Sequence, residues 1–533
     1  MTCSDETSSA PRGISCHGGY VINFNEYSPD GAFTIDDNMR FKKVTEFLKN
    51  ILYPDKNNKG TKASKSIIMA RVISQETYNE AVNENIEIFS MSPEEAIEET
   101  VKQFNSQGVD LSNIIKDLII TQDHDLILTY LDQLRSALTK KHYEKIPHVL
   151  DKLSVQLDKD IARRVYAGKR GCYGILLNIM KDCKYDTLIL KSALEAITSL
   201  MTGNPDLLDD KGVSIQMEIL DKQEDKLVLQ CLLRWIRACC IKHEANRQNI
   251  FNADIFNRLK KILTRDNATA SEVRDACSVI RALVLDDDIR HEYGKAHEHA
   301  TVIARGALDV LTGLLSRFKN EKAVMGDLMI TLASLIVRNE FCQDVTDAGG
   351  LKFVLDIIIN YPDSEKLNWQ ALKLLKALAG NDNVKSHIVT AGGGPLIVSV
   401  ISRFKKFEGI VIAGLACISA LTLRSPSNAG VFYDCGAPRI IIDCMKSYLK
   451  NLNVLKQAAW AIRNMSVRNK LECKEFIAYG VEEILNNALK IHGTKGESDI
   501  KAALRDLGLK VELKERWTGK GAKLNSEAEK RAS

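Results

Sequence analysis

The chain has 533 residues, of which 45% are hydrophobic and only 6% aromatic, and its formal net charge is +4. This length is too great for one compact core, so several domains or an array of repeats are expected. Many leucine, alanine, isoleucine and valine residues with few aromatics favour helices packed on helices. The small net charge and the lack of a long lysine or arginine run argue against nucleic acid as a partner.

The thirteen cysteines form no C-x-x-C pairs and show no regular ligand spacing. Several fall in apolar helical patterns and are interpreted as small core residues in a reducing compartment, namely Cys231, Cys277, Cys417 and Cys444. Residues 1–20 lack the apolar segment of a signal peptide, and the longest apolar stretch, from Gly409 to Leu423, is too short to span a bilayer. We therefore expect no membrane attachment and a cytoplasmic location, with the nucleus left open.

The polar composition and the helical periodicity divide the chain into four parts. Residues 1–66 show no sustained period and are expected to be a disordered extension. Residues 67–123 are predicted to be an N-terminal helical element followed by a linker. Residues 124–517 are expected to form one helical array with a C-terminal cap, and residues 518–533 a disordered tail.

One helix start in the N-terminal element is marked by its residues. Ser92 can cap the free N–H groups, Pro93 suits the first helical position, and Glu95 can complete a capping box. This helix is expected to end near Gln107, because Gly108 follows it.

A glycine followed by an apolar helix recurs in the second half of the chain, at Gly349, Gly392, Gly436 and Gly480. The interval of roughly 43 residues is typical of a tandem repeat of short helices. Glycine permits a tight turn between two helices without steric strain at Cβ. The stretch DDKGVSIQMEIL from Asp209 is expected to be an earlier copy.

Each copy is expected to contain a short helix, a turn, a medium helix and a longer helix such as QALKLLKAL or QAAWAIRNM. No copy can bury its apolar face alone, so neighbours must stack and share a continuous core. About eight copies between residues 150 and 500 therefore predict an all-α solenoid, a right-handed superhelix without strands. The segment from Asp499 to Trp517 is expected to cap the last copy with apolar side chains, namely Ala502, Ala503, Leu504 and Leu507.

The pattern N-x-x-x-(I/V)-x-x-A-G-G, followed by an apolar helix and A-x-x-x-(L/I)-x-x-L, resembles the armadillo repeat. Three further stretches look like the armadillo repeat-containing protein 6 family: Ser74–Ile114, Leu285–Ala300 (LDDDIRHEYGKAHEHA) and Ala502–Gly519 (AALRDLGLKVELKERWTG). The resemblance covers roughly residues 67 to 520. It implies a cytosolic, non-enzymatic armadillo protein and leaves open whether residues 1–66 belong to the main isoform.

Trp460 and Asn464 have the spacing with which armadillo transport proteins grip nuclear-localisation peptides. In those proteins a row of Trp and Asn, four residues apart on successive long helices, holds the peptide. The corresponding positions to Asn464 in the other repeats are occupied here by Ser199, Ala238, Ala282, Ser334, Ala377 and Ala420. Alanine cannot hydrogen-bond a peptide amide, so an importin-type transport or assembly adaptor is disfavoured. Trp460 and Asn464 are expected to face the groove, with ordinary packing as the alternative.

A positive residue recurs one position earlier on the same helices, at Arg237, Arg281, Lys376 and Arg463. These side chains are expected to line a concave face with a basic stripe that suits acidic peptides, because arginine pairs well with carboxylates. The alternative is that they remain solvated or form salt bridges between repeats.

His297 and His299 lie in an expanded repeat between Leu285 and Gly306. A zinc site would need two more ligands, which the sequence does not supply. The alternating His-x-His tract resembles the sequences that protein-histidine methyltransferases recognise, with Ala296 matching and Glu298 departing. The resemblance implies methylation of one histidine in an exposed loop or frayed helix, and solvated loop histidines without a role are the alternative.

No nucleotide-binding, hydrolase or metalloprotease motif is present in the sequence. The acidic run Asp286–Asp288 is interpreted as the cap of the next helix. The sequence therefore predicts a non-enzymatic, monomeric scaffold without cofactor or metal, which binds a partner protein or peptide along its concave groove.

Overall fold

The structure, a computed structural model, describes residues 15–16, 20–21, 71–89, 91–111, 114, 124–183, 186–290 and 294–512. The chain divides into two compact units, Met1–Ile119 and Ile120–Ser533. The expected tail at residues 518–533, the packing of Trp517 and nearly all of the 1–66 extension lie outside the described residues.

The described residues of the first unit include the helices α2 (Gln75–Glu87) and α3 (Pro93–Ser106), whose apolar sides share a small core with Tyr78 and Phe104. Ser92 caps α3, and Glu95 completes the capping box, as the sequence predicts. Two short strand pairs accompany the helices: β1 (Ser15–Cys16) runs antiparallel to β2 (Tyr20–Val21), and β3 (Arg71–Val72) runs parallel to β4 (Val109–Asp110).

The boundary of this unit differs from the expected one. Gly108 ends the helix with φ +71°, but the chain then returns along the unit as β4. Leu111 and Ile114 are buried in the same core as Phe104. The sequence predicts a linker here. The short strand β4 has no periodic pattern of its own that would reveal its pairing with the distant β3.

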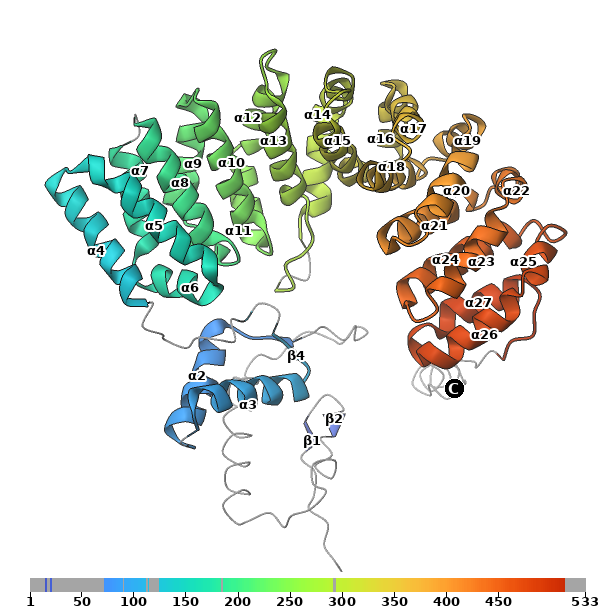
Figure 1. Ribbon diagram of the computed structural model, residues 1–533, viewed down its shortest axis with the longest axis horizontal. Coiled ribbons are helices and arrows are strands. Elements are labelled where there is room, and N and C mark those ends of the chain that lie inside the picture. Colours follow the sequence, from blue (N-terminus) through green and yellow to red (C-terminus); the bar gives the residue numbers. More distant parts are fainter. Residues whose placement is uncertain are drawn as a thin grey trace, which may run out of the picture. The chain divides into compact units, whose positions relative to one another are not determined.

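The described residues of the second unit form helices joined by short loops, without a strand, which confirms the all-α solenoid (Figure 1). It begins with α4 (His124–Lys140) and α5 (Ile146–Lys159). Three-helix repeats follow: α6 (Ile161–Lys169), α7 (Cys172–Asp182) and α8 (Thr187–Met201); a 3-10 turn (Pro205–Leu207), α9 (Asp210–Lys222) and α10 (Lys226–Cys240); α11 (Glu244–Asn252), α12 (Ile255–Thr264) and α13 (Ala270–Leu283).

The C-terminal half continues the series. Its helices are α14 (Ala296–Arg317) and α15 (Lys322–Leu335); α16 (Asn339–Asp347), α17 (Gly350–Asn360) and α18 (Glu365–Leu378); α19 (Asp382–Thr390), α20 (Gly393–Arg403) and α21 (Glu408–Thr422); α22 (Pro426–Asp434), α23 (Ala437–Ser447) and α24 (Leu452–Ser466); α25 (Lys474–Ala478), α26 (Val481–His492) and α27 (Glu497–Asp506). In the repeat of α14 and α15, the single 22-residue helix α14 stands where most repeats have two shorter helices.

The last helix of each repeat packs against the last helix of the next, so these helices form a continuous stack (Figure 1). We call this stack the ladder; its members are α5, α8, α10, α13, α15, α18, α21, α24 and α27. One apolar core runs along the whole second unit, from Ile127 to Leu507. Because each ladder helix has neighbours on both sides, the stack positions exposed side chains of successive repeats next to one another.

The recurring glycines make the turn for which the sequence places them. Gly349, Gly392, Gly436 and Gly480 precede their helices in the left-handed conformation, with φ between +72° and +88°. In an earlier repeat Asp254 adopts this conformation, with φ +63°. The recurring glycine therefore does not mark the turn of that repeat in the sequence. Gly212 lies inside α9 instead, so the copy expected from Asp209 has a different start.

The acidic run caps a different helix from the expected one. Asp288 accepts a hydrogen bond from the backbone N–H of Glu244, at 2.8 Å, and so caps α11 of the preceding repeat. Asp287 accepts from the backbone N–H of Lys242 and from the buried Arg247 guanidinium, at 3.1 and 2.6 Å. The acidic run therefore connects two repeats. Its partners lie 40 or more residues earlier in the chain, so the residues next to the run do not indicate them.

The C-terminal segment forms α27, which occupies the ladder position of the last repeat and packs on α24 and α26. Ala503, Leu504 and Leu507 are buried as expected, whereas Ala502 is only half-buried. Asp506 is also buried, and its carboxylate pairs with Arg463.

Candidate binding surface

The ladder exposes one side of each long helix, and charged residues of adjacent helices meet there. We call this side the ladder face. Arg274 of α13 donates to the Asp327 carboxylate of α15 at 2.8 Å, and Arg281 donates to the same carboxylate at 3.1 Å. Arg234 of α10 lies 3.8 Å from the carboxylate of Asp275 on α13. Part of the positive charge on this face therefore stabilises contacts between repeats.

Asp275 is the least well paired of these carboxylates. Its Oδ2 is buried and has no hydrogen-bond partner within the described residues. Burial raises the pKa of Asp275, although Arg234 and Arg274 favour its charged form.

The four residues of the expected basic stripe divide into two kinds. Arg281 and Arg463 pair with carboxylates of the next ladder helix, Arg463 with Asp506 at 3.0 Å. Arg237 and Lys376 are exposed and form no ion pair with any residue that the structure describes. The stripe of unpaired positive charge is therefore interrupted. The sequence alone does not show which cations meet a carboxylate from the next repeat.

Trp460 and Asn464 are both bonded to neighbouring ladder helices. The Trp460 indole N–H donates to the Asp499 carboxylate of α27 at 2.9 Å, although 41% of the residue remains exposed. The Asn464 amide donates to the backbone carbonyl and hydroxyl of Ser419 on α21, at 2.9 and 3.0 Å. The amide that would grip a peptide thus already has partners within the chain.

The sequence pattern missed a group on α18 that includes Lys376. The Lys373 ammonium lies 4.2 Å from the centre of the Trp369 ring, a cation–π distance. Burial lowers the pKa of Lys373, and the neighbouring charge of Lys376 lowers it further. Two lysines one helical turn apart thus lie together without a carboxylate partner among the described residues. The missed signal was the i, i+4, i+7 spacing of Trp369, Lys373 and Lys376.

The two candidate histidines lie at the start of α14 and not in a loop. His297 is exposed. His299 is 4% exposed, its Nδ1 lies 3.1 Å from the Leu283 carbonyl oxygen, and its ring stacks on Phe251 with 3.9 Å between centroids. Burial lowers the pKa of His299. His291 lies outside the described residues.

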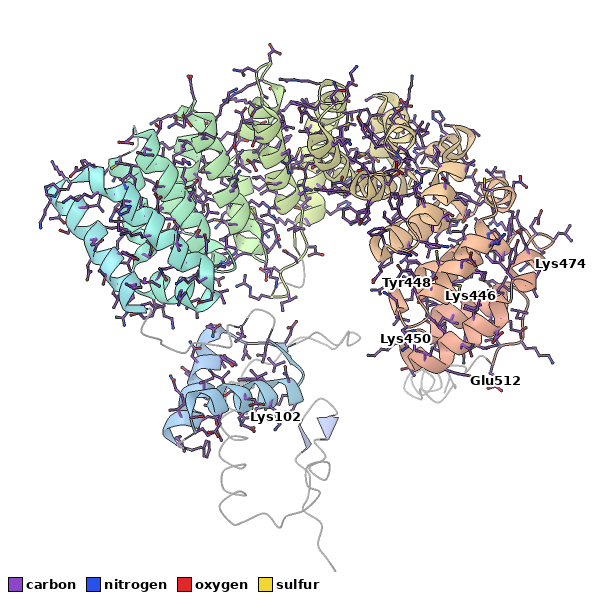
Figure 2. The ribbon with its side chains drawn as sticks, viewed as in Figure 1. Lys102, Lys446, Tyr448, Lys450, Lys474 and Glu512 are labelled. Carbon is purple, nitrogen blue, oxygen red and sulfur yellow. The ribbon has the colours of Figure 1, made fainter. Side chains whose placement is uncertain are left out.

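The described residues contain no group of three His, Cys, Asp or Glu side chains that could hold a metal ion. A shallow hollow of about 610 Å³ lies at the loop before α24, lined by Lys446, Tyr448 and Lys450, which Figure 2 labels. A second, of about 630 Å³, has both charges in its lining, including Lys260, Arg305 and Asp344.

The cysteines in the described part of the second unit are free, and all but Cys435 are buried. Burial raises the pKa of Cys277 and Cys417 to about 12. Within the described residues, no single helix is long and apolar enough to cross a membrane; the pair Asp382–Thr390 and Gly393–Arg403 passes by length and composition but is bent by 74°.

Two family models together match nearly all of the described helical residues. One, described as the armadillo repeat-containing protein 6 N-terminal domain, matches residues 70–129, and the family's main model matches residues 127–526. The chain belongs to the armadillo repeat-containing protein 6 family. The junction of the two models near residue 127 lies close to the start of α4 at His124.

Two relatives place the chain within this family. It is 41% identical over 465 residues to the armadillo repeat-containing protein 6 homolog of Drosophila melanogaster, covering 85% of this chain and 99% of that protein. It is 35% identical over 383 residues to armadillo repeat-containing protein 6 of Homo sapiens, covering 68% of this chain and 76% of that one.

The fold is also similar to a solved structure. The crystal structure of an engineered protein superposes with a TM-score of 0.58 at 17% identity, covering 87% of this chain and 98% of that chain. At this identity the similarity supports the solenoid fold alone.

Proposed function

We propose that this chain of the armadillo repeat-containing protein 6 family is a non-enzymatic scaffold that binds another protein along the ladder face. The observation that carries the proposal is a surplus of unpaired positive charge on an open, repeated surface. Arg237 on α10 and Lys376 on α18 are exposed and unpaired among the described residues, whereas neighbouring cations meet carboxylates. A protein segment with carboxylates at matching intervals would pair with them.

A protein suits this face better than a nucleic acid or a membrane. The carboxylates of Asp275 and Asp327 are interspersed with the cations, and they would repel a continuous row of phosphates. We propose that the protein is monomeric and has no cofactor. The proposed location is the cytoplasm, and the nucleus is the alternative.

The alternative is an importin-type transport or assembly adaptor, which Trp460 and Asn464 favour. Against it, Asn464 already donates both of its amide hydrogen bonds to Ser419. The corresponding Ala377 and Ala420 offer no amide at all. A peptide grip built on this spacing would therefore have a single position.

A protein-histidine methyltransferase is proposed as a further partner, with His297 as its substrate. The exposed ring of His297 is accessible at the start of α14, whereas His299 is enclosed by Phe251 and Leu283. Peptide mass spectrometry of the endogenous protein tests this: a methyl group on His297 is expected, and an unmodified peptide at high occupancy would contradict it.

Quantitative affinity purification of the full chain tests the scaffold proposal. The variant Arg237→Glu/Lys376→Glu reverses two unpaired ladder-face charges. Its matched control, Lys352→Glu/Lys446→Glu, makes the same charge change at exposed positions on α17 and α23. We expect the yield of at least one specific partner to fall about tenfold with the ladder variant and to stay unchanged with the control. Equal yields of every partner from both variants would overturn the proposal.

A further inference from the structure

The helix α21 differs from the rest of the ladder in having no Asp, Glu, Lys, Arg or His after Glu408 at its start. It is apolar on all sides, whereas α10, α13 and α24 each carry charged residues on the ladder face. A helix that is apolar all round is normally covered on every side. Its ladder side nevertheless remains partly open, at Ile412 and Ala420.

Exposed apolar residues extend this open side at the ends of the helices. Leu423, directly after α21, is 45% exposed, and Val467, directly after α24, is 46% exposed. The half-exposed Trp460 is a third apolar side chain, on α24 itself. Exposed apolar side chains on two ladder helices that pack together are candidates for an interaction site.

The residues of α21 are also shorter than those on either side of it. Ile412 and Ala420 are the half-buried residues of α21, which packs between α18, the helix of Trp369 and Lys373, and α24, the helix of Trp460. Gly409 lies beside the Trp369 ring, since a Cβ there would be in ordinary contact with the indole nitrogen, at 3.5 Å. The helix therefore forms a low apolar strip between two rows of larger side chains. We call this the α21 strip.

The charge beside the strip has one sign. Lys373 and Lys376 border it on α18, and no carboxylate of α15 or α21 pairs with them in the described part of the chain. Holding two ammonium groups together without a counter-charge is unfavourable, and a carboxylate supplied by a partner would relieve it. On the other border, Arg463 already pairs with Asp506, a carboxylate that it shares with Arg505. The attraction for carboxylates of a partner is thus strongest on the α18 side of the strip.

We infer that the α21 strip binds an acidic segment of a partner protein, whose apolar side chains lie on Ile412 and Ala420 while its carboxylates pair with Lys373 and Lys376. The inference rests on the proposed scaffold function and assigns it a position and a partner chemistry. The Trp460 ring would flank the apolar side chains, since its indole N–H is held by Asp499 and its face remains exposed.

Site-specific photocrosslinking in the full chain tests this inference. A benzophenone amino acid is placed at Ala420 on the strip, at Ser199 on the ladder face of α8, or at Lys352 on α17 as the control. After irradiation in cells, mass spectrometry identifies the partner peptide joined to each position. The inference predicts crosslinks at Ala420 to peptides that carry an excess of Asp and Glu beside apolar residues, and none at Lys352.

The captured segment is then made as a synthetic peptide and its affinity for the full chain is measured. We expect Lys373→Glu/Lys376→Glu to raise the Kd at least about tenfold, and Lys352→Glu/Lys446→Glu to leave it unchanged. Replacing the acidic residues of the peptide with Gln or Asn should weaken binding to the same extent and remove most of its salt dependence.

The outcomes separate this inference from the scaffold proposal. Crosslinks at Ser199 without crosslinks at Ala420 would leave the scaffold standing and overturn the α21 strip. A basic or uncharged peptide captured at Ala420 would overturn the acidic partner. Crosslinks confined to Lys352 would overturn both.

Discussion

Trp460 on α24 donates its indole N–H to the Asp499 carboxylate of α27, across 2.9 Å. One turn along α24, Arg463 pairs with the buried carboxylate of Asp506 at 3.0 Å. Two residues that the sequence suggests for peptide binding thus attach the last ladder helix to the one before it. The final repeat is therefore held by polar bonds as well as by the buried Leu504 and Leu507.

These two bonds should contribute unequally to stability. Asp499→Ala leaves an indole N–H that water can reach, so it should lower the free energy of unfolding by about 0.5–1 kcal/mol. Asp506→Ala leaves Arg463 without its carboxylate and should cost about 1–3 kcal/mol. Chemical denaturation of the full chain measures both, with Asp443→Ala at an exposed position of α23 as the control. An Asp506→Ala variant no less stable than Asp499→Ala would contradict this difference.

Asp327 should couple α13 to α15, because it accepts from both Arg274 and Arg281. A double-mutant cycle of Asp327→Ala with Arg281→Met is expected to give a coupling free energy of about 0.5–3 kcal/mol. The same cycle with Arg237, which lacks an ion pair in the described structure, is the control and should give a value near zero. Equal couplings in the two cycles would show that the Arg281 pair adds nothing.

Replacement of two glycines by alanine should change the stability of the chain in opposite directions. Gly392→Ala forces a Cβ into the left-handed region at φ +88°, and it should destabilise the chain by about 1–2 kcal/mol. Gly313→Ala is the matched change in the interior of α14, where an added Cβ meets nothing within 4 Å. It should stabilise the chain by about 1 kcal/mol. Thermal melts decide this, and equal shifts for both variants would rule out backbone strain as the cause.

His299 should make stability depend on pH. Burial holds its folded-state pKa below the ordinary value of 6.5, although the Leu283 carbonyl and the charges of Glu244 and Glu298 act in the opposite direction. The unfolded chain therefore binds the proton first, so stability is lost as the pH falls through 6.5 towards the folded-state pKa.

Melting temperatures at pH 7.5 and 5.5, values chosen to bracket the ordinary histidine pKa of about 6.5, test the His299 prediction. The wild-type chain should lose more stability between them than His299→Gln does. His297→Gln, at an exposed ring, is the control and should behave as the wild type. A pH dependence that His299→Gln leaves intact would assign it to other groups.

The solenoid could be predicted from the sequence because its signals are local. The Ser92 cap and the turn at Gly392 each depend on residues within one helical turn. The contacts that close the repeats could not be predicted in this way. Arg281 and Asp327 are 46 residues apart, and their pairing depends on how two ladder helices stack. Asp254 shows a second limit, since an aspartate took the left-handed conformation usually filled by glycine.

The candidate surface was only partly predictable for the same reason. The phase of Lys376 and Arg463 placed both on the ladder face, but only the structure shows that Arg463 has a carboxylate partner. The α21 strip was visible in the sequence as the apolar stretch from Gly409 to Leu423, which was used only to exclude a membrane span. Its importance depends on Lys373 and Trp460, which come from neighbouring repeats.

Hydroxyl-radical footprinting of the full chain, alone and with its purified partner protein, tests the binding face most directly. Four exposed side chains supply the comparison: Trp460 and Leu423 on the ladder face, and Ile359 and Ile491 on α17 and α26. The account predicts that the partner slows oxidation of Trp460 and Leu423 and leaves that of Ile359 and Ile491 unchanged. Protection of Ile359 and Ile491 with Trp460 and Leu423 still fully reactive would contradict it.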